Sequence, residues 1–427
     1  MSQGNPESWR DTILAGLANY IDAGSIVAGS IALAFWKDIY GLSDTFIGLI
    51  AAFSANAISA GVGALIGGIL CDKFGRKKIY QYDMLFYAFG MAWLVFATAP
   101  WMIVLGFVLV GLAVGADIPA SWSLIAEQAP DEKRGAHSGV AQILWYLGPV
   151  VVLVAAYFLK PFGIDGARWL FGHLLVLALG LTFLRSKMHE SKRWEEAQAA
   201  GMESPAARRE GWRQLLRAPY LGSILFLAAM YGFWNLWAGY NGFFTPYLIR
   251  ENNLPAWAET VLPASYFLVG MVSILAIFMT LSDKVNQRLL FGISAALHVV
   301  GMALLAVFGF TLEIVIAHIV IMGVAGGFGA QSFFQLWSAE LFPTAIRSTA
   351  QGLTFAIVRV ALGIWSLAVP TLATYDFTTL AWILTGFLVA SGVIGLVWAP
   401  RNEGKSLEQL AAERGDLRTL EVQQSAA

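Results

Sequence analysis

The sequence predicts an all-α polytopic membrane protein with twelve transmembrane helices in two six-helix bundles around a central cavity. Of the 427 residues, 58% are hydrophobic and 13% are charged, whereas about 25% of the residues of a soluble domain are charged. Apolar runs of roughly 20 residues, the length that a helix needs to cross a bilayer, occur twelve times. A motif in the first half of the chain also returns in the second half.

Polar segments divide the twelve spans into two groups of six. The longest, 187–218, follows the sixth span, and its mixture of charged and apolar residues predicts one or two amphipathic surface helices. A polar tail follows residue 399 and is expected to be helical near 407–414. We therefore expect a first bundle at 1–187, a linker at 188–218, a second bundle at 219–400 and a tail at 401–427. The expected spans are 12–36, 46–70, 79–98, 101–125, 136–159, 168–186, 220–244, 259–281, 288–309, 312–337, 349–371 and 376–398.

The distribution of Lys and Arg predicts the orientation. An even number of spans places both termini on one side, and the loops of that side hold 22 of the 27 basic residues, including eight from Arg185 to Arg217. The opposite side holds Lys37, Lys160, Arg168 and Arg250. Because cytoplasmic loops carry an excess of Lys and Arg, we expect a multi-pass protein of the cell membrane with both termini and the linker in the cytoplasm.

An internal repeat supports the division into two halves. The strings AEQAPDEKRGAHSG and AELFPTAIRSTAQG each follow an expected span, and four of their residues match at the same offset of 213 positions. A parallel repeat of this kind is the plan of many secondary transporters. The matching residues are Glu127, Pro130, Arg134 and Gly139, repeated as Glu340, Pro343, Arg347 and Gly352.

Further motifs lie in the loops. They are GGILCDKFGRKK at 67–78, LSDKVNQR at 281–288, HESKRW at 189–194 and PRNEGKSLEQL at 400–410. Together with the Glu–Pro–Arg repeats, they resemble the loop signatures of the major facilitator superfamily, and within it of the sugar-porter-like branch. The resemblance spans nearly the whole chain. It implies two six-helix bundles and secondary active transport of a small molecule by alternating access.

The spans themselves resemble that branch less uniformly. Tyr20-Ile-Asp22-Ala-Gly24 is similar to the GYDxG pattern of proton-coupled sugar and metabolite symporters. Sugar porters, however, carry an Arg where this chain has Phe107 and a Trp where it has Gln335. The string GADIPASWSLIAEQAP resembles metabolite:proton symporters, whose substrates include organic acids. The resemblance implies proton-coupled symport of a small polar metabolite, sugar or polyol-like, with an organic anion such as a carboxylate or aromatic acid as the alternative.

Charged residues in loops of the expected cytoplasmic side are candidates for a gate. Exposed ion pairs contribute only ~0–1 kcal/mol each, but several together can bias an equilibrium between two conformations. The resemblance implies the same role. The candidates are Asp72, Arg76, Glu127, Arg134, Asp283, Arg288, Glu340 and Arg347.

Three charges qualify as buried inside expected spans, where each costs at least ~2.5–3.5 kcal/mol at the bilayer centre. Asp22 and Arg359 each lie about ten residues into a span, near the midplane at ~1.5 Å per residue. We expect Asp22 to carry the proton; the alternative is that it only fixes the first helix. Asp117, two residues before Pro119, is either a second proton site or relay, or a structural partner for a cation or for freed backbone amides.

Arg359 cannot be neutralised and therefore needs an anion. If it pairs with Asp22, protonation of that carboxylate would release it and couple the proton to a change of conformation. If it faces the cavity alone, an anionic substrate is implied. The first interpretation is favoured because the expected spans hold two buried acids and one buried base.

Aromatic rings and side-chain amides concentrate in the fifth, seventh and tenth spans. Such groups suit a polyhydroxylated or ring-shaped substrate, and Gln331 and Gln335, at i and i+4, share one helical face. For each Trp, packing or a place at the membrane interface is the alternative. The candidate substrate-binding residues are Gln142, Trp145, Trp234, Asn235, Asn241, Gln331, Gln335 and Trp337.

Several functions find no support in the sequence. The net charge of −1 gives no reason to expect a nucleic-acid partner. We find no metal-ligand cluster, phosphate-binding loop or nucleophile–base pair, so we expect neither an enzyme, a cofactor nor a metal. The short tail disfavours a non-transporting membrane sensor. We expect a monomer in the lipid bilayer, and the identity of the substrate stays open.

Overall fold

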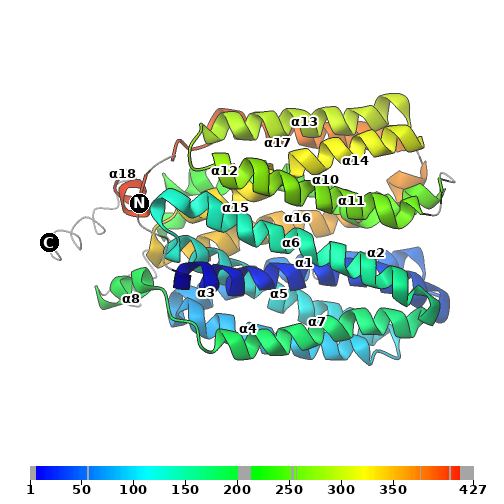
Figure 1. The fold of residues 1–427 in the computed structure, drawn as a ribbon, viewed down its shortest axis with the longest axis horizontal. Helices are drawn as coiled ribbons and strands as arrows, with labels where there is room; N and C mark the ends of the chain where they lie inside the picture. Colours follow the sequence, from blue (N-terminus) through cyan, green and yellow to red (C-terminus); the bar gives the residue numbers. More distant parts are fainter. Residues whose placement is uncertain are drawn as a thin grey trace.

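The computed structural model describes residues 6–54, 57–200, 213–251, 254–255, 257–375, 377–402 and 405–413. These residues form helices joined by short turns and include no β-strand. The long helices run side by side along the longest axis of the molecule (Figure 1). The short helices α8 (Lys192–Ala199) and α18 (Leu407–Glu413) lie at one end, on the left in Figure 1, with the turns at 75, 129–133 and 341–346. We call this the charged end.

The first half of the chain forms one group of packed helices. Here α1 packs against α6, α7 and α5, while α5 also contacts α3 and α4. A sharp turn at Gly75, where φ is +96°, joins α3 to α4; glycine adopts this left-handed conformation without steric cost. The helices are α1 (Pro6–Tyr40), α2 (Asp44–Ala52), α3 (Ile58–Phe74), α4 (Arg76–Val95), α5 (Pro100–Gln128), α6 (Arg134–Leu159) and α7 (Gly163–Arg185).

The second half forms a similar group. Here α13 packs against α17 and α14, and α10 packs against α16, α17 and α11. A π-helical turn, Ile274–Phe278, lies within the eighth span between α11 and α12. The helices are α10 (Tyr220–Glu251), α11 (Ala258–Ser273), α12 (Met279–Leu281), α13 (Gln287–Phe308), α14 (Leu312–Gly327), α15 (Ala330–Glu340), α16 (Arg347–Tyr375) and α17 (Phe377–Trp398).

All twelve predicted spans are found as helices, so the predicted fold class is confirmed. Two spans are broken where one helix was expected. The second divides into α2 and α3, and the Ser59 hydroxyl donates 2.8 Å to the carbonyl of Phe53 beside the break. The tenth divides at 328–329, after Gly326 and Gly327, because a run of glycines has low helical propensity. The tail helix predicted near 407–414 is present as α18.

Nine helical stretches among the described residues are long and apolar enough to cross a membrane. One of them, 131–185, contains both α6 and α7. The spans α3 and α4 fall short because α3 has only 17 residues and α4 carries Arg76 and Asp83. Asp72 of α3 and Arg76 and Asp83 of α4 are buried within the protein, whereas Lys73 and Lys78 are exposed near the turn at Gly75.

The most extensive contacts between the halves are two helix crossings. At the first, α3 packs against α16, and a Cβ added to Gly68 would lie only 2.3 Å from the carbonyl oxygen of Ser348. At the second, α6 packs against α11, and the rings of Tyr146 and Tyr266 stack with centroids 6.0 Å apart. In Figure 1, α6, α15 and α16 lie between the other helices of the two halves.

One residue lies where the sequence did not place it. Arg185 was counted among the basic residues of the loop after the sixth span, although the expected span 168–186 contains it; it is the last residue of α7, and its side chain is fully buried. The reason is an ion pair with Asp117, which holds the guanidinium inside the first half. Of the surface helices predicted in the linker, α8 is present; residues 201–212 lie outside the described part.

Candidate functional site

Three glutamines join the two halves through their side-chain amides. Gln142 of α6 donates through Nε2 to Oε1 of Gln335 on α15, and Gln331 donates through Nε2 to Oε1 of Gln142 at 3.1 Å. All three side chains are buried. Gln331 and Gln335 share a face of α15, as their spacing predicts. This amide chain places polar donors and acceptors between the halves, in the interior of an otherwise apolar bundle.

The predicted proton-coupling pair lies next to the amide chain. Trp145, three residues after Gln142 on α6, donates through Nε1 to Oδ2 of Asp22 at 3.3 Å. Asp22 is buried on α1 and interacts electrostatically with Arg359 of α16. The Arg359 guanidinium lies over the ring of Phe355, 4.4 Å from its centroid. Helices of both halves therefore hold the two opposite charges near the amide chain.

Side chains of the second half, to which Arg359 itself belongs, also contact its guanidinium. Nη1 of Arg359 donates to Oδ1 of Asn235 on α10 at 3.4 Å, and Tyr231 one turn earlier bonds to the same Asn235 side chain. Tyr231 in turn stacks on Phe334 of α15, with centroids 4.0 Å apart. Asn235, which lies 213 positions after Asp22, thus belongs to the same polar set.

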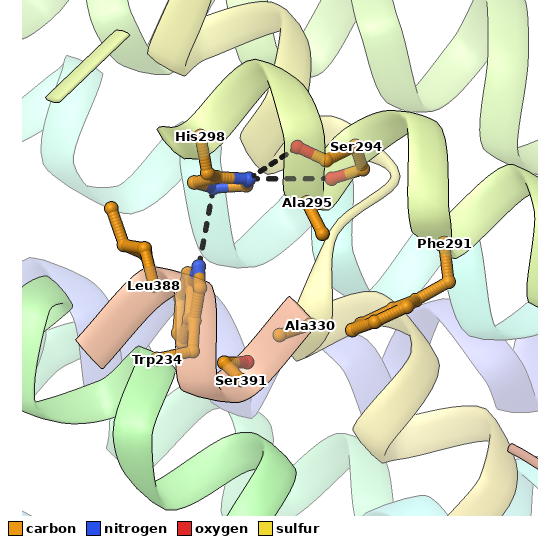
Figure 2. Close-up of a pocket in the computed structure, with 8 residues that line it drawn as sticks. All are labelled: Trp234, Phe291, Ser294, Ala295, His298, Ala330, Leu388 and Ser391. Atoms are coloured by element: carbon orange, nitrogen blue, oxygen red, sulfur yellow. Dashed lines mark hydrogen bonds between the residues drawn. The ribbon is translucent and has the colours of Figure 1, made fainter. Parts of the chain in front are cut away.

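Trp234 points into a separate small pocket within the second half (Figure 2). Its Nε1 donates 3.2 Å to Nε2 of His298, whose Nδ1 lies 2.9 Å from the carbonyl of Ser294. These bonds give His298 a single tautomer, with the hydrogen on Nδ1. The pocket has room for about one water molecule. Its lining residues are Trp234, Phe291, Ser294, Ala295, His298, Ala330, Leu388 and Ser391.

Trp337 and Arg288 bond to partners outside the amide chain. Trp337 is fully buried and donates through Nε1 to Oε1 of Gln287 at 2.6 Å, which is the packing alternative named for the tryptophans. Arg288 donates to the carbonyl of Ala399 at the end of α17. The side chain of Asn241 lies outside the described residues. A substrate-binding role for Trp337 and Asn241 stays a prediction.

Asp117 does not face the amide chain directly. Its Oδ1 lies 2.8 Å from Nη1 of Arg185, and the same nitrogen lies 3.5 Å from Oδ1 of Asp83 on α4. The sequence analysis identified Asp117 but missed Asp83. Asp83 lies close to the start of the expected span 79–98, and its charge was not counted among the buried ones. It also missed that Arg185 turns back into the bundle.

The predicted gate residues form ion pairs at the charged end. Glu127 contacts Arg76 at 3.0 Å and Arg347 of the other half at 2.7 Å. Arg134 and Glu340 form a second pair between the halves, at 3.2 Å. All these side chains are at most 3% exposed. Their burial distinguishes them from the exposed pairs considered above, since removing one partner of a buried pair leaves an uncompensated charge and costs about 3–5 kcal/mol. A role as a gate stays a prediction.

Two carboxylates, one near the end of α3 and one in the turn after α12, cap helices of the opposite half. Asp72, which also lies 3.3 Å from Arg76, accepts a hydrogen bond from the backbone N–H of Thr349 on α16 at 2.8 Å. Asp283 accepts one from Gly135 on α6, also at 2.8 Å. Carboxylates are favoured at helix N-termini because the free N–H groups point toward them. Burial raises the pKa of the Asp283 carboxyl, and the N–H groups of α6 oppose part of that rise.

Residues of the linker and the tail make further polar contacts at the charged end. Arg193 of α8 contacts Glu408 of α18 at 2.8 Å and donates to the carbonyl of Glu127 at 2.9 Å. Burial favours the neutral form of Glu408, but Arg193 holds the pKa of this carboxyl below its ordinary value. Glu190 accepts the backbone N–H of Lys77 at 3.0 Å, at the start of α4. The HESKRW and PRNEGKSLEQL motifs are therefore brought together.

Comparison with known proteins decides the family. The family model described as Major Facilitator Superfamily matches residues 12–366. The chain belongs to the Major Facilitator Superfamily. Curated relatives include the minor myo-inositol transporter IolF of Bacillus subtilis, which is 46% identical over 94% of this chain and 93% of its own length. The glucose transporter GlcP of Staphylococcus epidermidis is 25% identical over 94% and 95%.

Solved structures of the superfamily show the same fold. The proton:xylose symporter XylE bound to 6-bromo-6-deoxy-D-glucose has a TM-score of 0.80 at 18% identity, covering 96% of this chain and 98% of XylE. The inward open conformation of XylE from E. coli has a TM-score of 0.71 at 19% identity, covering 95% and 100%. This member of the superfamily is therefore a multi-pass membrane transporter and not an enzyme.

Proposed function

We propose that this protein is a proton-coupled symporter of a cyclic polyol of the inositol type. The observation that carries the proposal is the chain of Gln142, Gln331 and Gln335 between the halves. Each amide offers both donors and acceptors, which suits a ring whose every carbon bears a hydroxyl group. The 46% identical relative named as a myo-inositol transporter supports this substrate class over other polar metabolites.

Proton coupling follows from the contacts of Asp22. Its carboxylate is stabilised by Arg359 and by the indole N–H of Trp145, which lies on the same face of α6 as Gln142. A proton that binds Asp22 removes the negative charge facing Arg359. The guanidinium is then held by Asn235 and Phe355 of its own half, and the halves are freer to separate. Substrate and proton thus act on neighbouring side chains of one interface.

The contacts of Arg359 also bear on the organic-anion alternative. A guanidinium that interacts with Asn235, Phe355 and the charge of Asp22 already has partners within the protein. The relatives described above are named for a cyclitol and sugars. An anionic substrate held by Arg359 is therefore not favoured.

We further propose that the charged end faces the cytoplasm and that residues 1–187 and 219–400 rock against each other as two bodies. The basic loops gathered at that end support the orientation. The ion pairs of Glu127 with Arg347 and of Arg134 with Glu340 close this end, so substrate would enter from the opposite end in this state. Opening requires both pairs to break.

The test is uptake of labelled myo-inositol by proteoliposomes under an inward proton gradient. We expect accumulation against the inositol gradient, and its loss when the proton gradient is collapsed with an ionophore. The Asp22→Asn variant should lose gradient-driven accumulation but keep exchange of inositol at equal pH, because exchange needs no net proton movement. If Asp22→Asn accumulates inositol as well as the wild type, Asp22 does not couple the proton to transport. If the wild type fails to exchange inositol, the proposed substrate class is wrong.

A further inference from the structure

The first half contains a buried acid pair that lies outside the polar set between the halves. Asp83 of α4 and Asp117 of α5 both contact Nη1 of Arg185, at 3.5 Å and 2.8 Å, and the three side chains are at most 4% exposed. The guanidinium also lies 3.5 Å from the ring centroid of Tyr80 and donates to the Tyr80 carbonyl. Two carboxyl groups therefore share one cation in the protein interior.

The charge balance of this cluster requires a proton. One guanidinium neutralises one carboxylate, and a second buried carboxylate without a partner costs several kcal/mol. Asp117 accepts the hydrogen bond from Arg185. Neither carboxyl oxygen of Asp83 accepts a hydrogen bond from the described part of the chain. The Asp83 and Asp117 carboxyl groups also lie within hydrogen-bonding reach of each other. The pair therefore holds one proton, on Asp83, which can donate it toward Asp117.

The other ionisable groups around the pair do not supply the missing positive charge. On α3, Cys71 lies within electrostatic range of both acids, together with the ion pair of Asp72 and Arg76. On α1, the buried Asp11 is an acid that acts electrostatically on Tyr80 and is not a source of positive charge. On α4 itself, Tyr80 is neutral at physiological pH. Protonation is thus the way for Asp83 to remain buried.

Polar side chains lie between this pair and Asp22. Tyr80, Asp83 and Tyr87 follow one another at helical spacing on the buried face of α4. The Tyr87 hydroxyl donates 3.2 Å to the carbonyl of Ile21, the residue before Asp22, and Tyr87 also bonds to Ser25, one turn after Asp22. Asp83 and Tyr87 are four residues apart, about 6 Å along the helix axis.

We propose that Asp83 is a second proton-carrying residue, which receives the proton from Asp22 inside the first half and releases it toward the charged end. The proposal rests on the proposed proton symport. Asp83 first releases the proton that it already holds. The O–H bond of protonated Asp22 then breaks and an O–H bond forms on ionised Asp83, once the hydroxyl groups of Ser25 and Tyr87 turn away from the backbone carbonyls to which they donate and pass the proton on. Asp22 becomes a carboxylate facing Arg359, and Asp83 becomes neutral. Asp83 later gives the proton to water at the charged end.

This arrangement separates the path of the proton from that of the substrate. The substrate crosses between the halves, past Gln142 and Gln335, whereas the proton moves between α1, α4 and α5 within one half. The pair holds its proton while the charged end is closed. Separation of the halves at that end admits water near Tyr80 and Asp11 and allows Asp83 to release it.

Infrared spectroscopy tests the protonation of Asp83 directly. A protonated carboxylic acid has a C=O stretch that shifts in D₂O, and it disappears on ionisation. We would compare purified Asp22→Asn protein with the Asp22→Asn/Asp83→Asn double variant in neutral-to-alkaline difference spectra, so that Asp22 does not contribute. We expect the double variant to lose a band that Asp22→Asn/Asp83→Glu retains at a shifted frequency. An unchanged spectrum would overturn the proposal.

Transport measurements test the role of the proton. Asp83→Asn removes an acid but leaves the Asp117–Arg185 pair intact, so we expect a folded protein with unchanged Tm. It should exchange inositol at equal pH and lose accumulation driven by a proton gradient, whereas Asp83→Glu should restore it. If the wild type accumulates substrate and Asp83→Asn does so equally, the Asp83 proposal alone is wrong. If the wild type itself shows no gradient-driven accumulation, the proposed symport is wrong and the relay with it.

Discussion

At the scale of single residues, the amide chain shows how a polar site is kept inside an apolar bundle. Gln142 hydrogen-bonds to both Gln331 and Gln335, so both bonds of the amide chain are lost without its side chain. A buried amide left without its partner costs about 1–3 kcal/mol. Nε2 of Gln335 has no hydrogen-bond partner in the described part of the chain. A substrate with several hydroxyl groups can replace the internal bonds with its own and also accept a hydrogen bond from this amide.

Replacing Gln142 with Leu should therefore weaken substrate binding. We expect the KM for inositol exchange to rise about tenfold or more, since ~1.5–3 kcal/mol of hydrogen bonding is lost. The measurement is exchange in proteoliposomes at several inositol concentrations. Gln287→Leu is the matched control: it removes the acceptor of the Trp337 indole N–H, so it should lower Tm and leave KM unchanged. Equal KM values for both variants and the wild type would argue against the site.

At the scale of elements, glycines allow the backbones of α3 and α16 to approach closely where the two halves meet. A Cβ on Gly68 of α3 would lie 2.3 Å from the Ser348 carbonyl oxygen, and one on Gly352 of α16 would lie 2.2 Å from that of Ala64. Backbones this close allow short contacts over the whole crossing. They also allow Asp72 at the end of α3 to reach the first turn of α16.

Gly68→Val should force α3 and α16 apart. Overpacking of this kind costs typically about 1–3 kcal/mol, and here the cost falls on the state with the charged end closed. We expect a lower Tm and a slower gradient-driven uptake of inositol. Gly386→Val on α17 is the control, because a Cβ there meets nothing within 4 Å. If the two variants behave alike, the crossing is looser than the structure shows.

At the scale of the whole molecule, closure of the charged end is shared between matching parts of the two halves. The carboxylates of Asp72 and Asp283 each cap a helix of the opposite half. Between them, Ser348 of α16 donates 3.0 Å to Ser123 of α5. Contacts made by both halves break together when the end opens, which favours two distinct conformations over intermediate ones.

A disulfide between positions 123 and 348 should lock this end. The chain has one cysteine, Cys71, so the double variant Ser123→Cys/Ser348→Cys can be made in a Cys71→Ala background. The two hydroxyl oxygens are 3.0 Å apart, which places the corresponding sulfur atoms within bonding reach. We expect oxidation to stop inositol transport and a reductant to restore it. The single-cysteine variants should be insensitive to both, and full transport by the cross-linked protein would contradict alternating access through this end.

The sequence by itself determined the fold class, the twelve spans, the two-fold repeat and most polar side chains of the candidate site. It could do so because hydropathy and helical spacing are local properties, and because a charge in an apolar run is visible without a structure. Gln331, Gln335 and Asp22 were found in this way. Their roles in substrate and proton binding stay predictions.

Only the tertiary structure decided which groups meet. Helical spacing says that Gln331 and Gln335 share a face, but the rotation and packing of α6 and α15 place Gln142 against both. Arg185 was expected in a loop, and packing of α7 against α4 brought it to Asp83 and Asp117. Partners across helices depend on how whole spans are rotated and crossed, which the energy of the assembled bundle fixes and no single stretch of sequence contains.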